Sequence, residues 1–392
     1  MKVAVLGAAT TQFGELWDIS PRALVREAVS EALLASNLRI TDIDALYVGN
    51  MLSGILGGQE NLGAFFAEEL GFAGPAFKIE GACASGGLAF YNGAVAVRSG
   101  MFERVLVVGV EKMTDHKPED VALGLMGAGS DVERQAGITF PGLYAILARA
   151  HMEKYGTTEE ELAAVAVKNH FHAVLNSKAH FNNLITIAKV LASPKIADPL
   201  KLLDCSPISD GAAAAVIVSE AVAQKGQTPV WLIGAGVASD SLGLAGRKEI
   251  TSLSAAKRAA KLAYKAARVG PRDIEVAEVH DCFTIAELIA LEDLGFYEPG
   301  KAGKALLREE LTLGKAQHLV VNPSGGLKAC GHPVGATGVK QVVEIVSQLR
   351  GTSGKRQVEK TRIGLTHNVG GSGAVAAVHI FQGKAGSGKG KG

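Results

Sequence analysis

Gly81-Ala82-Cys83-Ala84-Ser85-Gly86-Gly87 is the stretch that decides how this chain folds. An extended apolar run at 76–79 leads into it, and an Ala-rich helical pattern follows it. A thiol on a tight turn at the start of a helix lies in the positive field of the helix amides, which favours thiolate over thiol. The alternative is a buried structural thiol. The glycines and the serine around Cys83 favour an exposed, activated nucleophile on a strained corner between strand and helix.

Apolar runs and helical patterns alternate on both sides of this turn. The first half predicts strands at 3–6, 45–48, 76–79 and 105–110, and helices at 21–36, 61–69 and 83–99. The second half predicts strands at 230–234, 273–279, 363–366 and 374–381, and helices at 254–267 and 335–349. Because the order strand, helix, strand, cysteine-bearing loop, helix occurs twice, we expect a duplicated α/β fold with its site between the halves.

The same alternation suggests a division of the chain. We expect an N-terminal half made of 1–110 and 205–224, and a C-terminal half at 225–382. Strand signals fade over 111–204, which we interpret as a segment inserted into the first half. The last residues, 383–392, alternate glycine, lysine and serine, as is typical of a disordered tail.

Composition excludes several classes of protein. The chain has 392 residues, 47% of them hydrophobic, and a net charge of +1, which argues against a nucleic-acid binder. A membrane span needs an apolar run of about 18 residues, and the sequence contains none. Its N-terminus lacks the flanking residues of a signal peptide. Four cysteines without a Cys-x-x-Cys pair indicate neither a disulfide scaffold nor a zinc ribbon. We expect a cytoplasmic protein without a metal.

A candidate base lies in the loop Cys330-Gly331-His332-Pro333. Glycine and proline stiffen the backbone there, so the imidazole of His332 can project from it. Histidine suits a thiol nucleophile because its pKa lies near neutrality. A solvent-exposed loop histidine is the alternative, and the density of glycine and proline around His332 favours the base.

A second cysteine follows a predicted strand in His280-Asp281-Cys282-Phe283. A thiol beside an imidazole can exchange a proton with carbon. The alternative is a pair of metal ligands, but two soft ligands are too few for a closed zinc site without help from elsewhere.

Two further segments are weaker signals. The stretch His367-Asn368-Val369-Gly370-Gly371-Ser372-Gly373 is a glycine turn whose amides could face an oxyanion. The stretch 204–211, which contains Cys205 and Ser206, reads either as an ordinary loop before a strand or as the lining of a ligand channel.

Taken together, these segments resemble the thiolase superfamily over essentially the whole chain up to the tail. The specific signals are the Cys-x-Ser turn at Cys83 and the Gly-His-Pro-x-Gly-Ala-x-Gly loop at 331–338. The chain is most similar to the branch that includes the archaeal acetyl-CoA acetyltransferases and the sterol-carrier-protein-type thiolases. That branch carries His-Asp-Cys-Phe, as at 280–283, and His-Asn, as at 367–368. The resemblance implies a duplicated thiolase-like fold of two mixed, mostly parallel sheets in an α-β-α-β-α arrangement.

The resemblance also implies catalytic roles. Cys83 becomes acylated, and His332 takes its thiol proton and later polarises the thioester oxygen. Cys282 is the acid and base for the α-carbon of the second substrate. His280 helps to build the first oxyanion hole. Cys330 is the reserve for Cys282 if the Cys282 side chain points away.

The glycine turn and a coenzyme A channel complete the implied site. His367 stands where other thiolases have a second cysteine. The amide of Cys83 and an amide near Val369 or Gly370 form the second oxyanion hole. The candidates for the channel lining are Cys205, Ser206, Ile208 and Lys328.

The implied activity is acetyl-CoA C-acetyltransferase, which condenses two acetyl-CoA to acetoacetyl-CoA through an acyl-cysteine as the first step of the mevalonate pathway. The alternatives are a degradative 3-ketoacyl-CoA thiolase of the sterol-carrier-protein type, a non-catalytic scaffold subunit and a decarboxylating ketosynthase. No cofactor is implied besides the coenzyme A thioester substrates. The implied partners are a second copy of the chain, at least as a dimer, and a complex with HMG-CoA synthase and a zinc-bearing OB-fold protein.

Overall fold

The computed structural model describes residues 2–223 and 228–383. Its main sheet has ten strands, five from each half of the chain. From the centre outward, the first half contributes β1 (Val3–Thr10), β7 (Gly211–Ser219), β4 (Arg104–Glu111), β2 (Ala45–Gly49) and β3 (Ala76–Ile79). The second half contributes β8 (Val230–Ser239), β12 (Val375–Gln382), β11 (Ile363–Gly370), β9 (Val276–Glu278) and β10 (Val320–Val321).

The two halves follow one plan. In each half the first strand in the chain lies at the centre, the last lies beside it, and the second and third form the outer edge. The expected duplication is therefore present. The two sheets that we expected join into one, because β1 pairs with β8 over Val3↔Leu232, Ala4↔Trp231 and Val5↔Val230.

Strand direction differs from the expectation of mostly parallel pairing. In each half the outer strands β4, β2, β3 and β11, β9, β10 pair in parallel, and the inner pairs are antiparallel. The β1–β8 pair is also antiparallel. The sequence did not distinguish the two arrangements, because inner strands such as β7 are buried on both faces and read as the apolar runs of a parallel sheet.

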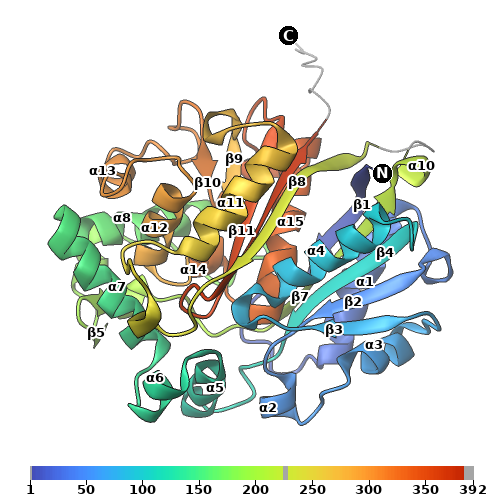
Figure 1. The fold of residues 1–392 in the computed structure, drawn as a ribbon, viewed down its shortest axis with the longest axis horizontal. Helices are drawn as coiled ribbons and strands as arrows, with labels where there is room; N and C mark the ends of the chain where they lie inside the picture. Colours follow the sequence, from blue (N-terminus) through green and yellow to red (C-terminus); the bar gives the residue numbers. More distant parts are fainter. Residues whose placement is uncertain (1, 224–227, 384–392) are drawn as a thin grey trace.

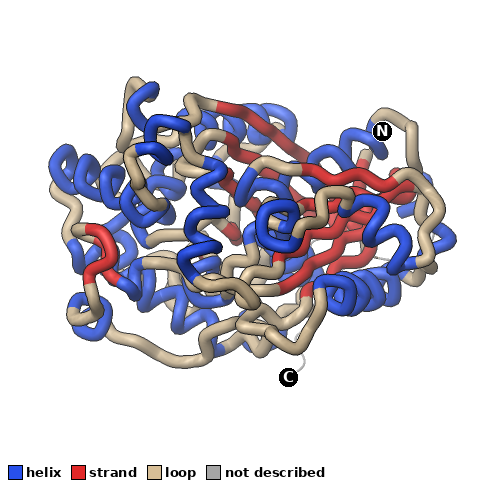
Figure 2. The backbone as a smooth tube through the Cα atoms, turned by 90° about the horizontal axis from the view of Figure 1, so that it is seen from below, coloured by secondary structure: helices blue, strands red, loops and turns tan. Residues whose placement is uncertain are grey.

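Helices cover the strands in layers (Figures 1 and 2). One outer layer contains α1 (Pro21–Ser36) and α3 (Leu62–Leu70), which pack on the first half of the sheet. The other contains α11 (Ser254–Ala267) and α12 (Thr284–Asp293), which pack on the second half. Between them lie α4 (Ser85–Arg98) and α15 (Val334–Arg350), whose side chains share one core with strands of both halves. This is the expected α-β-α-β-α layering.

Local sequence accounts for these helices. The Ser20 hydroxyl caps α1 by accepting from the Ala23 amide at 3.2 Å, and proline opens its first turn. Helix α11 lies against β8 through small residues. A Cβ on Gly236 would lie 2.1 Å from the Ala259 carbonyl oxygen, so only glycine permits this spacing.

The segment between β4 and β7 lies at the left and bottom in Figure 1, and two of its helices share a core with elements of the second half. It contains α5 (Pro118–Leu125), α6 (Asp131–Gln135), α7 (Phe140–Tyr155), α8 (Glu159–Val174), α9 (Ile187–Leu191) and a two-stranded sheet of β5 (Lys195–Ala197) and β6 (Leu200–Lys201). The remaining helices are α2 (Ser53–Gly57), α10 (Glu220–Ala223), α13 (Ala302–Leu307) and α14 (Gly326–Cys330). Of the expected tail, all but Gly383 lies outside the described residues.

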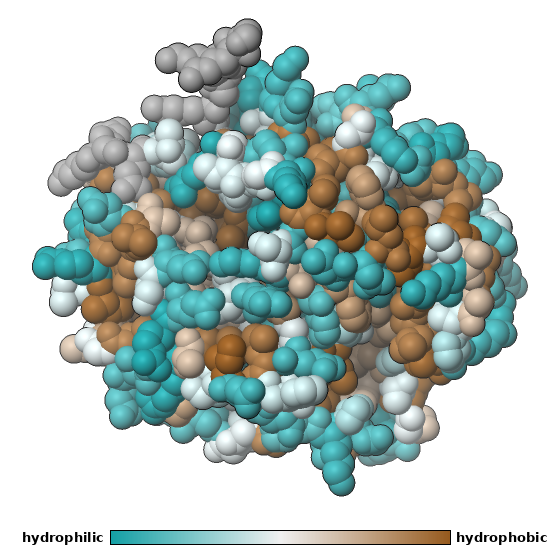
Figure 3. All heavy atoms as spheres, turned by 180° about the vertical axis from the view of Figure 1, so that it is seen from behind, coloured by the Kyte–Doolittle hydropathy of each residue, from teal (hydrophilic) through white to brown (hydrophobic). Residues whose placement is uncertain are grey.

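The surface mixes polar and apolar side chains. On the face in Figure 3, hydrophilic residues surround several small hydrophobic patches. Within the described ranges, no helix has both the length and the apolar character that crossing a membrane requires.

Candidate active site

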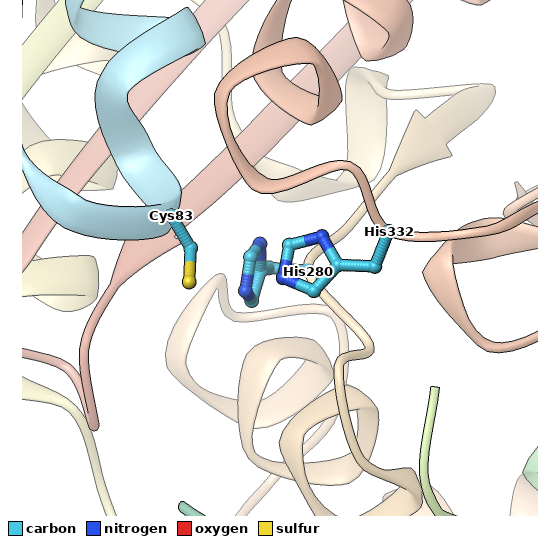
Figure 4. A group of neighbouring side chains, drawn as sticks. All are labelled: Cys83, His280 and His332. Atoms are coloured by element: carbon cyan, nitrogen blue, oxygen red, sulfur yellow. The ribbon is translucent and has the colours of Figure 1, made fainter. Parts of the chain in front are cut away.

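Three reactive side chains meet near the N-terminal ends of the two central helices, α4 and α15. The sulfur of Cys83 and one ring nitrogen each of His280 and His332 lie within 4.8 Å of one another. Figure 4 shows the three side chains pointing toward one another. The two imidazole rings are 5.2 Å apart between centroids and stand at 83°. The structure thus brings together three of the four residues with expected catalytic roles, from segments far apart in the sequence.

Cys83 lies on a tight turn between β3 and α4. Ala82, just before it, adopts φ +54°, in the left-handed region that alanine rarely enters. The Ser85 hydroxyl holds this turn, because it accepts from the Gly81 amide at 3.0 Å and donates to the Ala82 carbonyl at 2.6 Å. The expected strained corner between strand and helix is therefore present at Cys83.

Close packing of the two central helices brings Cys83 to His332. A Cβ on Gly86 would lie 2.6 Å from the Gly335 carbonyl oxygen, and a Cβ on Gly335 would lie 2.5 Å from the Val110 carbonyl oxygen. Glycine at position 86 lets the N-terminal ends of α4 and α15 touch backbone to backbone, and glycine at position 335 lets α15 lie against the end of β4. The residues just before these helices are therefore neighbours.

The hydrogen bonds of His332 fix which of its nitrogens can accept a proton. Its Nδ1 lies 2.8 Å from the Thr337 hydroxyl, which donates to the Pro333 carbonyl at 3.1 Å. Because a carbonyl can only accept, the Thr337 hydroxyl donates its one hydrogen to Pro333 and accepts from His332 Nδ1. The neutral ring then has a free lone pair on Nε2, and His332 lines the same cavity as Cys83.

Burial sets the protonation states at rest. Desolvation raises the pKa of Cys83 to about 12. The hydrogen bond from the Gly371 amide lowers this pKa but does not offset the desolvation. Burial likewise lowers the pKa of His332 to about 3. Loss of hydration thus opposes the helix amides, whose field favours the thiolate, and it outweighs them. Cys83 is a neutral thiol beside a neutral imidazole, and its proton moves only when a substrate changes this balance.

A cavity of about 180 Å³ opens at Cys83. Its lining includes the expected residues His332, Cys282, Cys205, Ser206 and Ile208. Apolar side chains supply most of the remaining wall: Met113, Ala122, Leu125, Phe140, Pro141, Pro207, Phe283 and Val334. The cavity is therefore apolar around a few convergent reactive groups, as ligand sites usually are.

Tyr144 on α7 is a cavity residue that sequence reasoning missed. Its ring stacks on Phe283 at 4.6 Å, and its hydroxyl donates to the Gly371 carbonyl at 3.2 Å. The Tyr144 hydroxyl also contacts the Cys282 thiol. Desolvation raises the pKa of Cys282 well above its usual value, while this contact lowers it. No local pattern in the sequence marks Tyr144, because its contacts come from tertiary packing.

The glycine turn reaches the cavity through Gly371. The two expected positions, Val369 and Gly370, instead pair with Ala376 and Val375 in the β11–β12 ladder. Strand β11 continues to Gly370 and the turn begins only after it, so the turn residue at the cavity is Gly371, next to the expected Gly370.

Besides His280, Val369 and Gly370, three expected residues lie outside the cavity wall: Lys328, Cys330 and His367. Lys328 is buried beside the His170 ring at 3.5 Å, and burial lowers its pKa to about 8. Cys330 lines a separate small cavity with Asn176 and cannot replace Cys282. The buried His367 side chain accepts from the His280 amide at 3.5 Å. These positions follow from the turns of α14 and from the alternation of β11, which point these side chains away from the cavity.

The donor set of Cys83, His280 and His332 resembles that of a soft metal site. All three side chains are buried, and the Nδ1 atom of His280 lies 3.2 Å from the Asn368 side-chain nitrogen. The same three residue types also suit covalent acyl transfer, which needs a nucleophile, a base and a hydrogen-bond donor.

Comparison with known proteins agrees with this geometry. The thiolase N-terminal domain family matches residues 3–221, and the thiolase C-terminal domain-like family matches residues 236–383. The acetyl-CoA acetyltransferase of Methanothermobacter thermautotrophicus is 48% identical over 97% of this chain and 99% of its own. Human sterol carrier protein 2 is 33% identical over 95% of this chain and 71% of its own.

Solved structures agree as well. The Ltp2-ChsH2(DUF35) aldolase superposes with a TM-score of 0.83 at 26% identity, over 97% of this chain and 98% of that one. The expected resemblance to archaeal acetyl-CoA acetyltransferases and sterol-carrier-protein-type proteins is confirmed. The chain belongs to the thiolase family and is an acyltransferase enzyme of that family.

Proposed function

We propose that the protein is an acetyl-CoA C-acetyltransferase, which condenses two acetyl-CoA to acetoacetyl-CoA and coenzyme A. The observation that carries this proposal is that Cys83, His332 and Cys282 line one cavity, with His280 beside the first two. The 48% identical relative named acetyl-CoA acetyltransferase supports the choice of substrate.

In the first half-reaction, the Cys83 sulfur attacks the thioester carbon of acetyl-CoA. Its proton passes to His332 Nε2, which the Thr337 contact leaves as an acceptor. The bond between carbon and the coenzyme A sulfur then breaks, and Cys282 gives its proton to that sulfur. The products are acetyl-Cys83, free coenzyme A and a Cys282 thiolate.

In the second half-reaction, the Cys282 thiolate removes an α-proton from another acetyl-CoA. His280 donates to the enolate oxygen, and the carbanion attacks the acetyl carbonyl of Cys83. The oxygen of that carbonyl is stabilised by the amides of Cys83 and Gly371. Each preorganised donor contributes about 3–4 kcal/mol to such a step. Cys83 then leaves and recovers its proton from His332, which restores the starting state.

The second candidate is degradative thiolysis of longer 3-ketoacyl-CoA, which the similarity to human sterol carrier protein 2 favours.

An acyl-chain series separates these two functions. We expect kcat/KM for thiolysis of acetoacetyl-CoA to exceed that for 3-ketoacyl-CoA of eight or more carbons by at least about tenfold, together with net synthesis of acetoacetyl-CoA when coenzyme A is removed. A protein that cleaves only the long substrates contradicts the acetyltransferase. A protein inactive on both supports the scaffold subunit.

The wider setting is also a proposal. Acetoacetyl-CoA synthesis places the protein at the first step of the mevalonate pathway, in the cytoplasm. We propose at least a dimer, and a complex with HMG-CoA synthase through an OB-fold protein. The aldolase contains a protein of this fold together with a DUF35 component, which supports the idea that this chain has a protein partner. Co-purification of the three proteins, with size-exclusion chromatography and light scattering, tests it.

A further inference from the structure

The side chain of Asn368 on β11 connects the nucleophile turn to His280. Its Oδ1 accepts from the Gly87 amide at 3.1 Å. Its Nδ2 donates to the Cys83 carbonyl at 3.0 Å and lies 3.2 Å from His280 Nδ1. A Cβ on Gly87 would lie 2.8 Å from Asn368 Oδ1, so the glycine leaves room for this amide. Asn368 is buried, and its hydrogen bonds to two backbone groups hold its side chain in one position.

The orientation of the Asn368 amide follows from two backbone groups. The Gly87 N–H can only donate, so its partner is the oxygen of the side chain. The Cys83 carbonyl can only accept, so its partner is the nitrogen. Both contacts require the same orientation, with the NH₂ group toward His280. The NH₂ group donates one hydrogen to the Cys83 carbonyl, and its other hydrogen faces His280 Nδ1.

This contact determines the tautomer of His280. Burial and the neighbouring His332 lower the pKa of His280 well below its usual value, so the ring is neutral and carries one N–H. Because Nδ1 faces a donor, it must accept, and the proton is then on Nε2. Among the described residues, this buried Nε2 has no hydrogen-bond partner. An N–H without a partner in a buried site is expected to meet its acceptor in the substrate.

We propose that Asn368 is a positioning residue, which holds His280 in the tautomer whose Nε2–H donates to the thioester oxygen of the substrate. This inference rests on the proposed function and assigns Asn368 a role within it. The two histidines then have opposite states. Thr337 leaves a lone pair on Nε2 of His332, for the proton of Cys83. Asn368 leaves a hydrogen on Nε2 of His280, for the substrate oxygen.

Without Asn368, both neutral tautomers of His280 become available. The tautomer with its proton on Nδ1 turns an Nε2 lone pair toward the oxygen that gains negative charge, which repels it. The same lone pair would complete the soft donor set with Cys83 and His332. Asn368 therefore keeps the three groups arranged for acyl transfer rather than for metal binding.

Neutron diffraction tests the tautomer directly. In crystals of the deuterated wild-type enzyme, we expect deuterium on Nε2 of His280 and none on Nδ1. Deuterium on Nδ1, or an Asn368 amide with its oxygen toward His280, overturns the proposal. This measurement does not involve turnover, so it remains decisive even if the enzyme proves to use another acyl-CoA.

A double-mutant cycle tests the consequence for catalysis. Asn368→Leu removes the donor at nearly constant volume, and we expect kcat for condensation to fall about 10²-fold with a smaller change in KM. In a His280→Asn background the amide donor has no tautomers, so Asn368→Leu is expected to cost less than about threefold. An equal loss in both backgrounds shows that Asn368 only supports the packing and overturns the proposal. If a variant fails to fold, the neutron measurement on the wild type decides.

Discussion

The two halves of the molecule share one strand order but contribute unequally to the cavity. In the first half, the turn after β3 provides the Cys83 thiol. In the second half, the loops after β9, β10 and β11 provide Cys282, His332 and Gly371. One half therefore carries the nucleophile, and the other carries the groups suited to moving protons and holding an oxyanion.

Two of the corresponding loops of the first half, those after β2 and β4, have a structural role instead. The buried carboxylate of Glu111, at the end of β4, accepts from the Asn50 side chain at 2.7 Å and from the Met51 and Leu52 amides at 3.0 and 3.1 Å. It also accepts from the Gly335 amide at 3.1 Å, at the start of the helix that follows His332. In a duplicated fold, a loop of one half can thus fix the position of a reactive residue in the other half.

The largest effect is expected from His332→Ala, which removes the base contributed by the second half. We expect the rate of Cys83 acylation by acetyl-CoA to fall by about 10²–10⁴-fold, measured in a single turnover. Thr337→Val, which removes only the contact to Nδ1, is the graded control, with an expected loss of about tenfold. Unchanged acylation in His332→Ala would mean that the first half activates its own thiol.

Cys282→Ala separates the two half-reactions. We expect exchange between acetyl-CoA and labelled coenzyme A to persist at a reduced rate, while condensation falls by about 10²–10⁴-fold because no group takes the α-proton. Cys330→Ala is the matched control, since that thiol lies outside the cavity, and condensation should stay within about twofold of the wild type. A loss of condensation in Cys330→Ala alone would reverse the assignment.

Tyr144→Phe keeps the stacking on Phe283 and removes the hydroxyl that contacts Cys282. This contact lowers the pKa of Cys282, so its loss should raise that pKa and slow condensation by about tenfold. Acylation of Cys83 should change by less than about threefold. An equal loss in both half-reactions would assign Tyr144 to the shape of the cavity rather than to the second cysteine.

Much of this arrangement could be predicted from the sequence. The repeated alternation of elements gave the duplication, and the glycine-rich segments gave Cys83, His332 and Cys282. Tyr144 was missed because a helix in the segment 111–204 reaches the cavity only through tertiary packing. The burial of Cys83 was not predicted, because a helix terminus can be recognised in a sequence, whereas the depth of burial that raises the pKa to about 12 cannot.

The smallest expected effect concerns the structural role of the first half. Desolvation raises the pKa of Glu111 to about 7 from 4.5, so the unfolded chain releases this proton at a lower pH than the folded protein. The contribution of Glu111 to the free energy of unfolding therefore decreases as pH rises from about 4.5 to about 7. Glu111→Gln lacks this pH dependence. Its NH₂ group would face two N–H donors that the Glu111 oxygen accepts from, which should lower the free energy of unfolding by about 1–3 kcal/mol.

Thermal unfolding of both proteins between pH 5 and 8 measures this difference. The wild type should exceed Glu111→Gln in stability most at pH 5, and the margin should shrink toward pH 7. A margin that stays constant from pH 5 to 8 would mean that Glu111 is ionised throughout, and that the first half holds the His332 helix by charge.

The most direct measurement is the identification of the acylated residue. After brief mixing of the enzyme with acetyl-CoA and quenching in acid, mass spectrometry of the peptides should find one acetyl group on Cys83, and none in Cys83→Ala, which should also make no acetoacetyl-CoA. An acetyl group on another cysteine, or continued synthesis of acetoacetyl-CoA by Cys83→Ala, would contradict the division of labour between the two halves.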